Sequence, residues 1–215
     1  MIEFSESFNR ESLPLTIDAL QIEAAHFASN ESRHDEPQLY GVTDGKAVGT
    51  YLERKFQTML NEKYDYERGS SAKGIDFPSL NVDLKVTSVR QPQSSSPFKS
   101  ARQKVFGLGY SLLVFVYLKT DDEHARTARL EILNTIFVDK SRTADYQTTR
   151  GIRDILNREG NADDLIAYMN DRNLPLDELE TAKIAEELLI NPPRLGYLTI
   201  SNALQWRLQY KRVIE

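Results

Sequence analysis

The sequence predicts an α/β fold in which helices surround a mixed central sheet, followed by a helical region that ends in a β-hairpin. Two patterns predict it: apolar residues recur at strand spacing in the middle of the chain, and amphipathic helical segments come before and after them. With 215 residues, the chain can bury a substantial core. We expect a core domain over residues 1–142, including an N-terminal extension, and an accessory region over residues 143–215.

The first predicted core element is a helix from Gly45 to Asn61. Thr43 and Asp44 offer an N-cap, because a short polar side chain can accept a hydrogen bond from the free N–H groups of the first turn. Apolar residues then recur every three or four positions, at Val48, Leu52, Phe56 and Met59. This spacing gives the helix an apolar face that can pack on a sheet.

The next predicted element is a strand that carries two charged residues on one side. Apolar and polar residues alternate from Val82 to Thr87, which places the apolar set on the core face. Asp83 and Lys85 then share the opposite face, with Cβ atoms about 7 Å apart. That separation leaves room for a cation and a water between the carboxylate and the ammonium.

A turn before this strand brings in a second carboxylate. Residues 78–81 (Pro-Ser-Leu-Asn) have turn chemistry, which lets Asp76 fold back toward Asp83. Neighbouring carboxylates repel each other unless a hard cation lies between them, and Mg²⁺ prefers oxygen ligands. Together with Lys85, the Asp76 and Asp83 carboxylates indicate a metal-dependent nuclease. An ordinary ion pair on a surface hairpin is the alternative.

Further elements follow in the order expected for a packed sheet. Residues 88–100 form a polar loop rich in Ser, Gln and Pro, and residues 101–107 predict a short helix that ends at Gly107. The apolar run of residues 110–118 predicts a central strand covered on both faces. Residues 130–138 predict a second, alternating strand.

This order and the Asp76/Asp83-x-Lys85 pattern resemble the PD-(D/E)xK nuclease superfamily, which includes the type II restriction endonucleases. The resemblance covers about a third of the chain, and it departs at Ile75, where the motif has proline. It implies a restriction-endonuclease-like αβββαβ core. It also implies that Asp76, Asp83 and the Leu84 carbonyl bind the metal and that Lys85 is the catalytic amine. One strand of that core is not evident, because residues 86–98 lack a clean apolar alternation.

Glu53 is a further candidate for the catalytic and metal site. Many members of the superfamily carry an acidic residue on the helix before the hairpin. Glu53 lies about 100° from Leu52 around the helix axis, at the margin of the apolar stripe. From that position the side chain can face either the metal or the solvent, and the sequence leaves both interpretations open.

The charge distribution suggests where nucleic acid binds. The formal net charge is −5, which is unusual for a protein that neutralises phosphates. From Leu84 to Thr120, however, there are six basic residues and no acidic one, so positive charge is concentrated just after the proposed site. A flexible, solvated loop is the competing interpretation. The predicted DNA contacts in this window are Arg90, Gln91, Lys99, Arg102, Gln103 and Lys104.

The last third of the sequence predicts three amphipathic helices and a terminal hairpin. The first helix ends at Gly160, the second begins after Asn161, and the third opens at Asp177. Residues 197–210 predict the hairpin. These elements also resemble a winged-helix module with a basic wing, although two of the helices are too acidic for a recognition helix. The region could instead complete the fold, support dimerisation or contact DNA.

Several other classes of site are not indicated. The chain has no cysteine, and its three histidines are scattered without zinc-ligand spacing. No glycine-rich loop indicates a nucleotide cofactor. No apolar run approaches 18 residues and no signal-peptide pattern is present, so we expect a soluble, cytoplasmic protein without membrane contact.

Taken with the resemblance, the sequence predicts a Mg²⁺-dependent type II restriction endonuclease. Such an enzyme would hydrolyse double-stranded DNA at a short specific site and act as a homodimer. Two alternatives remain at this stage. One is a structure-specific repair or recombination nuclease with the same core, and the other is a non-enzymatic winged-helix regulator that binds DNA.

Overall fold

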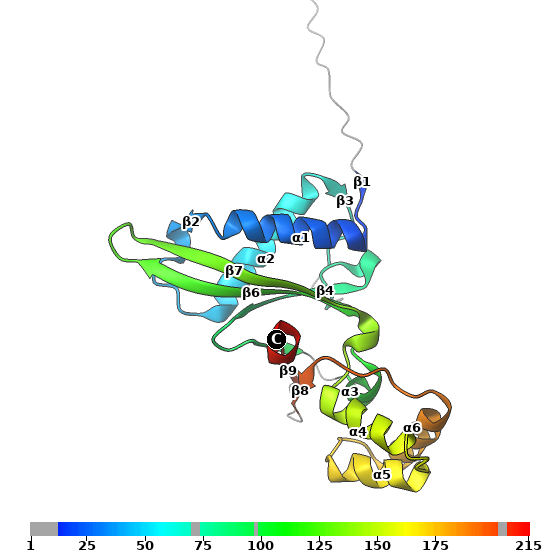
Figure 1. Ribbon diagram of the computed structural model, residues 1–215. Helices are drawn as coiled ribbons and strands as arrows, with labels where there is room; N and C mark the ends of the chain where they lie inside the picture. The colour runs from blue at the N-terminus through cyan, green and yellow to red at the C-terminus, as the bar shows by residue number, and fades with distance from the viewer. Residues whose placement is uncertain (1–12, 70–73, 97–98, 202–205) are drawn as a thin grey trace, which may run out of the picture.

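The computed structural model describes residues 13–69, 74–96, 99–201 and 206–215. Its centre is a four-stranded sheet in the order β2-β7-β6-β4 (Figure 1). Strand β4 (Val82–Ser88) runs parallel to β6 (Ser111–Asp122), whereas β6 is antiparallel to β7 (Thr127–Val138). The short strand β2 (Asp35–Glu36) is antiparallel to β7 at the other edge. The predicted α/β class with a mixed central sheet is confirmed.

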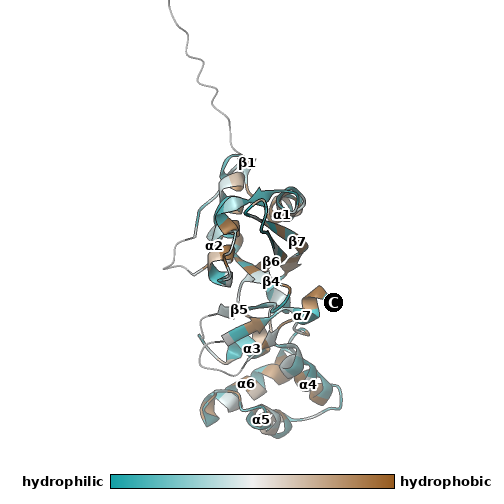
Figure 2. Cartoon of the chain, turned by 90° about the vertical axis from the view of Figure 1, so that its left-hand side faces the viewer, coloured by the Kyte–Doolittle hydropathy of each residue, from teal (hydrophilic) through white to brown (hydrophobic). Residues whose placement is uncertain are grey.

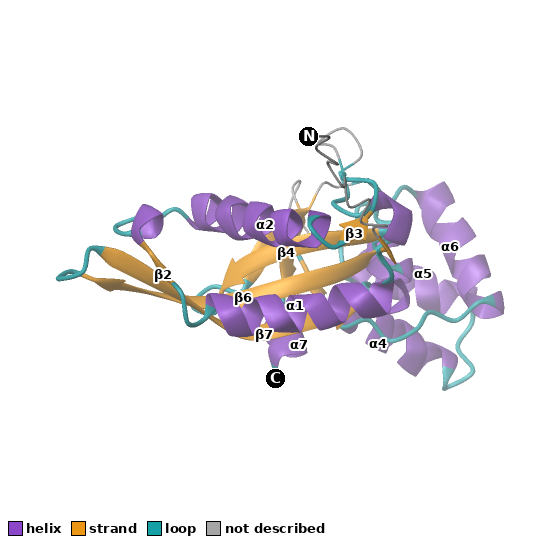
Figure 3. Cartoon of the chain, turned by 90° about the horizontal axis from the view of Figure 1, so that it is seen from above, coloured by secondary structure: helices purple, strands orange, loops and turns teal. Residues whose placement is uncertain are grey.

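Two helices, α1 (Ile17–Glu31) and α2 (Gly45–Asn61), cover one face of this sheet (Figure 3). Helix α2 has the predicted bounds, and the Asp44 side chain caps it by accepting a hydrogen bond from Lys46 N at 3.0 Å. Helix α1 was not predicted from the sequence. Its signal was present, since Thr16 caps it and its apolar residues Leu20, Ala24 and Phe27 are buried.

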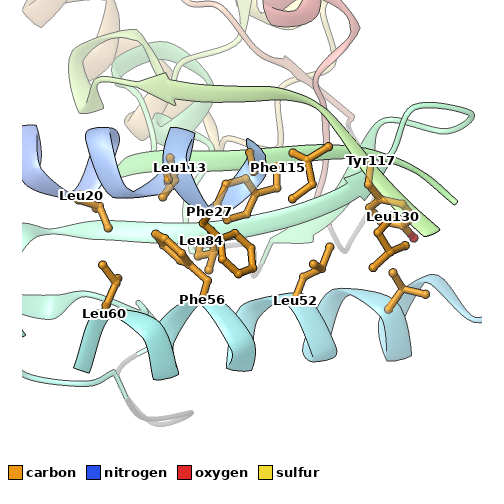
Figure 4. Packing of buried hydrophobic residues seen from close by; sticks show 14 of the residues in the cluster. Leu20, Phe27, Leu52, Phe56, Leu60, Leu84, Leu113, Phe115, Tyr117 and Leu130 are labelled. Carbon is orange, nitrogen blue, oxygen red and sulfur yellow. The ribbon is translucent and has the colours of Figure 1, made fainter. Parts of the chain in front are cut away.

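The core between these helices and the sheet is built around phenylalanine rings. The Phe56 ring lies 5.2 Å from both the Phe27 and Phe115 rings, measured between centroids, and the three come from α2, α1 and β6 (Figure 4). Leu84 of β4 joins the same cluster. Because this apolar face of β4 is fixed against the helices, its alternate residues are directed to the other side of the sheet.

A second sheet covers the opposite face. It contains β5 (Gln93–Ser96), β9 (Trp206–Gln209) and β8 (Thr199–Ile200) in that order, with antiparallel neighbours. The β8–β9 pairing confirms the predicted terminal hairpin. The prediction of an irregular loop through residues 88–100 was wrong at β5. This polar segment forms a strand because its partner β9, near the other end of the chain, satisfies its backbone groups.

The second sheet packs on the central sheet through a separate apolar cluster. Leu112 and Val114 of β6 contact the C-terminal segment, whose buried members are Leu198, Ile200, Leu208 and Tyr210. Figure 2 shows β5 and the C-terminal helix α7 (Lys211–Ile214) on this side of β4 and β6. The terminal hairpin therefore lies on the core rather than with the helices that precede it in sequence.

The helical region has its own small core. Helices α4 (Tyr146–Leu156), α5 (Ala162–Asp171) and α6 (Glu178–Ile190) confirm the three predicted helices, and α3 (Arg102–Phe106) packs with them. Buried Asp145 connects this region to the second sheet. It caps α4 by accepting from Thr148 N and also accepts from Ile200 N of β8, both at 2.8 Å. None of the described helices is long and apolar enough to cross a membrane. The remaining strands are β1 (Leu13–Pro14) and β3 (Tyr64–Asp65).

Candidate active site

A tight turn joins the first candidate carboxylate to β4. Phe77 and Val82 pair across the turn, with N–H to carbonyl distances of 3.0 and 3.2 Å. Asn81 closes the turn in the left-handed region at φ 55°, a conformation that asparagine tolerates. Asp76 Oδ2 then accepts a hydrogen bond from Leu84 N at 2.9 Å. The predicted return of Asp76 onto the strand is confirmed.

Asp83 and Lys85 lie on the same side of β4, as the alternation predicted. Lys85 Nζ is 2.7 Å from Asp83 Oδ2. Only 4% of Asp83 is exposed, because the second sheet covers this face of β4. The Lys85 side chain is 21% exposed and connects the buried carboxylate to the surface.

The site carries more negative than positive charge. Burial raises the pKa of Asp83 to about 7; Lys85 opposes this rise, and the nearby Asp76 carboxyl adds to it. Burial also raises the pKa of Glu53 to about 7, with a further rise from the charge of Asp76. Burial acts to lower the pKa of Lys85, but the charge and hydrogen bond of Asp83 together with the charge of Asp76 outweigh burial, and the pKa is raised. Three carboxyl groups therefore share one ammonium, which favours binding of an additional cation.

The donor set at this place fits a hard cation, because every candidate ligand is an oxygen. Besides burial, the charge of Asp76 raises the pKa of both Asp83 and Glu53, so the three carboxyl groups lie near one another. Across the described part of the chain, however, no three His, Asp or Glu side chains gather closely enough to hold a metal ion. A divalent metal would thus use two carboxylates together with backbone, water or phosphate oxygens, as Mg²⁺ often does.

Lys85 and Glu53 open into a groove of about 950 Å³. Residues of α2 line one wall, β4 lies along the groove, and residues of β5 and β9 line the other wall. Lys119 and Asp121 from the end of β6 pair with each other in the lining. The basic residues of the lining are Lys46, Lys85, Arg90, Lys119 and Arg207, against two acidic ones, Glu53 and Asp121.

The structure separates the predicted DNA contacts into two groups. Arg90 and Gln91 line the groove beside Lys85, whereas Lys99 is exposed but does not line it. Arg102 Nη2 pairs with Glu187 at 2.7 and 2.9 Å and so connects α3 to α6.

Two further predicted contacts lie under the helical region. Gln103 and Lys104 are only 7% and 5% exposed. Gln103 donates a hydrogen bond to the Leu108 carbonyl, and burial lowers the pKa of Lys104. Their burial disfavours direct contact with DNA. The basic composition of this segment could not reveal which side of the short helix is covered.

Sequence reasoning missed several residues that surround the site. Lys46 and Lys119 join the groove from distant parts of the chain. Lys119 belongs to the basic window of residues 84–120 but was not among the predicted contacts, and local sequence held no signal for Lys46. Behind Asp83, two tyrosines contact serines of β5. The Tyr210 hydroxyl lies 2.6 Å from Ser94 Oγ, and the Tyr110 hydroxyl lies 3.2 Å from Ser96 Oγ. Tyr110 begins the apolar run that predicted a buried strand, and Tyr210 ends the segment that predicted the terminal hairpin, so neither pattern indicated a place near the site.

Comparison with known proteins gives a single consistent family. A family described as "Type II restriction enzyme NspV" matches residues 14–215. A type II restriction enzyme NspV from Nostoc sp. is 68% identical over 201 residues, which cover 94% of this chain and 91% of the relative. No solved structure matches the chain. The chain therefore belongs to the type II restriction enzyme NspV family and is an enzyme, a site-specific endodeoxyribonuclease.

Proposed function

We propose that this protein is a Mg²⁺-dependent type II restriction endonuclease that hydrolyses both strands of duplex DNA at a short specific site. The observation that carries this proposal is the buried Asp83–Lys85 pair, with Asp76 folded against it and Lys85 opening into a mostly basic groove. Family membership supports the same activity and excludes the non-enzymatic regulator.

Asp76 and Asp83 would hold the metal, with the Leu84 carbonyl as a further oxygen ligand. When bound, Mg²⁺ would polarise the scissile phosphate and lower the pKa of a bound water. The charge of Asp76 adds to burial in raising the pKa of Glu53, and this third carboxylate would contribute directly or through a water. These three carboxylates are assigned to the metal because they place more negative charge around Lys85 than its ammonium balances.

Lys85 and Glu53 are the site residues that reach the groove, so they would act on the attacking water. The ammonium of Lys85 would orient the water and offset negative charge on the pentavalent transition state. Glu53, which also lines the groove, would accept the proton that the water loses. Attack would form a bond from the water oxygen to phosphorus and break the bond to the 3′ oxygen, which would take a proton from solvent water, leaving a 5′-phosphate and a 3′-hydroxyl.

Asp83→Asn tests the site assignment. The variant should lose plasmid cleavage in Mg²⁺, because the amide cannot replace the carboxylate, while it still binds duplex DNA. Asp121→Asn is the matched control, since Asp121 lines the same groove but pairs with Lys119. Cleavage by Asp83→Asn at the parental rate would reject the site assignment. Discrete fragments from the parental enzyme would support a restriction activity, whereas cleavage dependent on junctions or ends would support a repair nuclease.

A homodimer is part of the proposal, because two copies are the simplest way to cut both strands at a palindromic site. Sedimentation equilibrium of the protein alone and with a duplex containing its site would measure the assembly. A monomer under both conditions would reject this part and leave the site assignment intact.

A further inference from the structure

The outward face of the β5–β9 pair forms a polar surface, which we name the polar ribbon and define as Gln93, Ser95, Arg207 and Gln209. The antiparallel register places Gln93 opposite Gln209 and Ser95 opposite Arg207, so all four side chains emerge on one side. Ser95, Arg207 and Gln209 are exposed and Gln93 is half-buried. The alternate residues Leu208 and Tyr210 are buried in the core.

The side chains of the polar ribbon have no bonding partner within the described part of the chain. Arg207 forms no ion pair with a described residue, and the two glutamine amides make no side-chain hydrogen bond to one. The three strands of this sheet contain no Asp or Glu, although acidic residues outnumber basic ones by 32 to 27 in the chain. A face with amide and guanidinium donors, without acid or large apolar groups, suits a hydrogen-bonding, negatively charged partner.

The polar ribbon is fixed in position relative to the catalytic lysine. Gln93, Ser95 and Arg207 line the same groove as Lys85 and Glu53. The Thr87 side chain of β4 holds the start of β5, because its hydroxyl accepts a hydrogen bond from Gln93 N at 2.9 Å. A duplex whose backbone reaches Lys85 would therefore present its bases to a preformed surface.

We propose that the polar ribbon enters the major groove of the substrate and reads base edges, with Arg207 and the two glutamines as specificity-determining residues. This inference rests on the proposed function and names the surface that would select the site. The major groove is about 12 Å wide and admits two paired β-strands. Strands β5 and β9 pair over four residues, and β8 extends the sheet only beside Leu208 and Gln209. Arginine can bond guanine O6 and N7 in a bidentate manner, and glutamine can bond adenine N6 and N7 in the same way.

The test begins with the site itself, mapped from the ends that the parental enzyme leaves in plasmid DNA. Cleavage rates are then measured on duplexes that carry each single base-pair substitution of that site. Arg207→Ala should lower the rate on the parental site by about 10- to 100-fold and reduce discrimination mainly at one base pair in each half-site. Gln93→Ala should also lower the cleavage rate and reduce discrimination, but at a different base pair of each half-site.

Lys46→Ala provides the matched control, because Lys46 lines the groove from α2 and lies outside the polar ribbon. A phosphate contact should weaken binding to all sequences alike and reduce the salt dependence by about one counterion. Arg207→Lys retains the charge and loses bidentate geometry, so it should keep the salt dependence and lose discrimination. Circular dichroism melting of each variant confirms that it is folded at the assay temperature.

The outcomes separate the two proposals. One outcome is that the parental enzyme cuts at a discrete site while Arg207→Lys and Gln93→Ala show the same ratios of cleavage rate between the parental site and each substituted site. In that case the polar ribbon does not read bases. The proposed function survives that result. If the parental enzyme cuts no discrete site in the presence of Mg²⁺, the proposed function fails, and the inference fails with it.

Discussion

Two clusters in this protein each combine two carboxylates with one lysine, and they differ in how that lysine is paired. The strand cluster is Asp76, Asp83 and Lys85. The helix cluster is Glu31, Glu36 and Lys55, at the contact of α1, β2 and α2. In the helix cluster one ammonium pairs with both carboxylates, 2.8 Å from Glu31 and in direct contact with Glu36. In the strand cluster, Lys85 pairs with Asp83, and Asp76 accepts from a backbone N–H.

In each cluster burial raises the pKa of one carboxyl group, Glu31 in the helix cluster and Asp83 in the strand cluster. Burial also acts to raise the pKa of Glu36, but the hydrogen bonds from Lys55 and Tyr51 and the nearby positive charge together outweigh it, and the pKa is lowered. In the strand cluster, burial prevails and raises the pKa of Asp83 to about 7. Each cluster sets two carboxylates against one ammonium. The strand cluster differs because its lysine opens into the groove, whereas Lys55 pairs with both carboxylates and does not line the groove.

The largest expected difference between the clusters is in catalysis. Lys85→Ala should lower the single-turnover cleavage rate by about 10²- to 10⁴-fold, because it removes the group that would position the attacking water. Lys55→Ala should leave that rate within a few-fold of the parental value. Both rates are measured on the same plasmid, well below each variant's melting temperature. Equal losses in the two variants would remove the functional distinction.

The next effect is on stability. Lys55→Ala leaves Glu31 and Glu36 buried without their shared cation, which should cost about 2 kcal/mol, less than a fully buried pair because a third of the lysine is exposed. Urea unfolding at pH 8 measures the change, and Lys55→Arg is the control that retains the charge. An unchanged midpoint for Lys55→Ala would show that the helix cluster does not depend on this pairing.

The third effect is a pH dependence at Glu53, whose pKa is raised by burial and in part by the charge of Asp76 in the strand cluster. The pKa of Glu53 is raised to about 7 in the folded state, so the folded chain holds a proton that the unfolded chain releases. Its contribution to stability is present below about pH 4.5 and is lost as the pH rises to about 7. In EDTA, Glu53→Gln should have a flatter profile and melt about 2–4 °C higher at pH 8. Parallel melting curves from pH 4.5 to 8 would contradict this.

The smallest effect is expected at Glu31. Burial raises its pKa, and its Oε1 atom lacks a hydrogen-bond partner among the described residues. Glu31→Gln removes a charge that is costly to bury but weakens the contact with Lys55, and the two effects oppose each other. We expect a change below about 1 kcal/mol in the free energy of unfolding at pH 8. A larger loss, measured by urea unfolding, would mean that both carboxylates of the helix cluster must be charged.

Local patterns in the sequence predicted much of the strand cluster. Helical spacing located α2, alternation placed Asp83 and Lys85 on one side of β4, and turn chemistry returned Asp76 to them. These features depend on backbone geometry within a few residues, so the sequence contains all the information required. The sequence also placed Glu53 at the margin of the apolar stripe of α2, because its angle around the helix axis follows from helix geometry.

Only the tertiary structure decided which surfaces lie around the strand cluster. Segment 93–96 carries no apolar alternation, and it is a strand because β9 pairs with it. The same pairing brings Arg207 to the groove. Conversely, Gln103 and Lys104 belong to a basic segment but are covered by the helical region. Pairing and coverage depend on residues distant in the chain, so spacing and composition could locate the catalytic strand but not the wall that faces it.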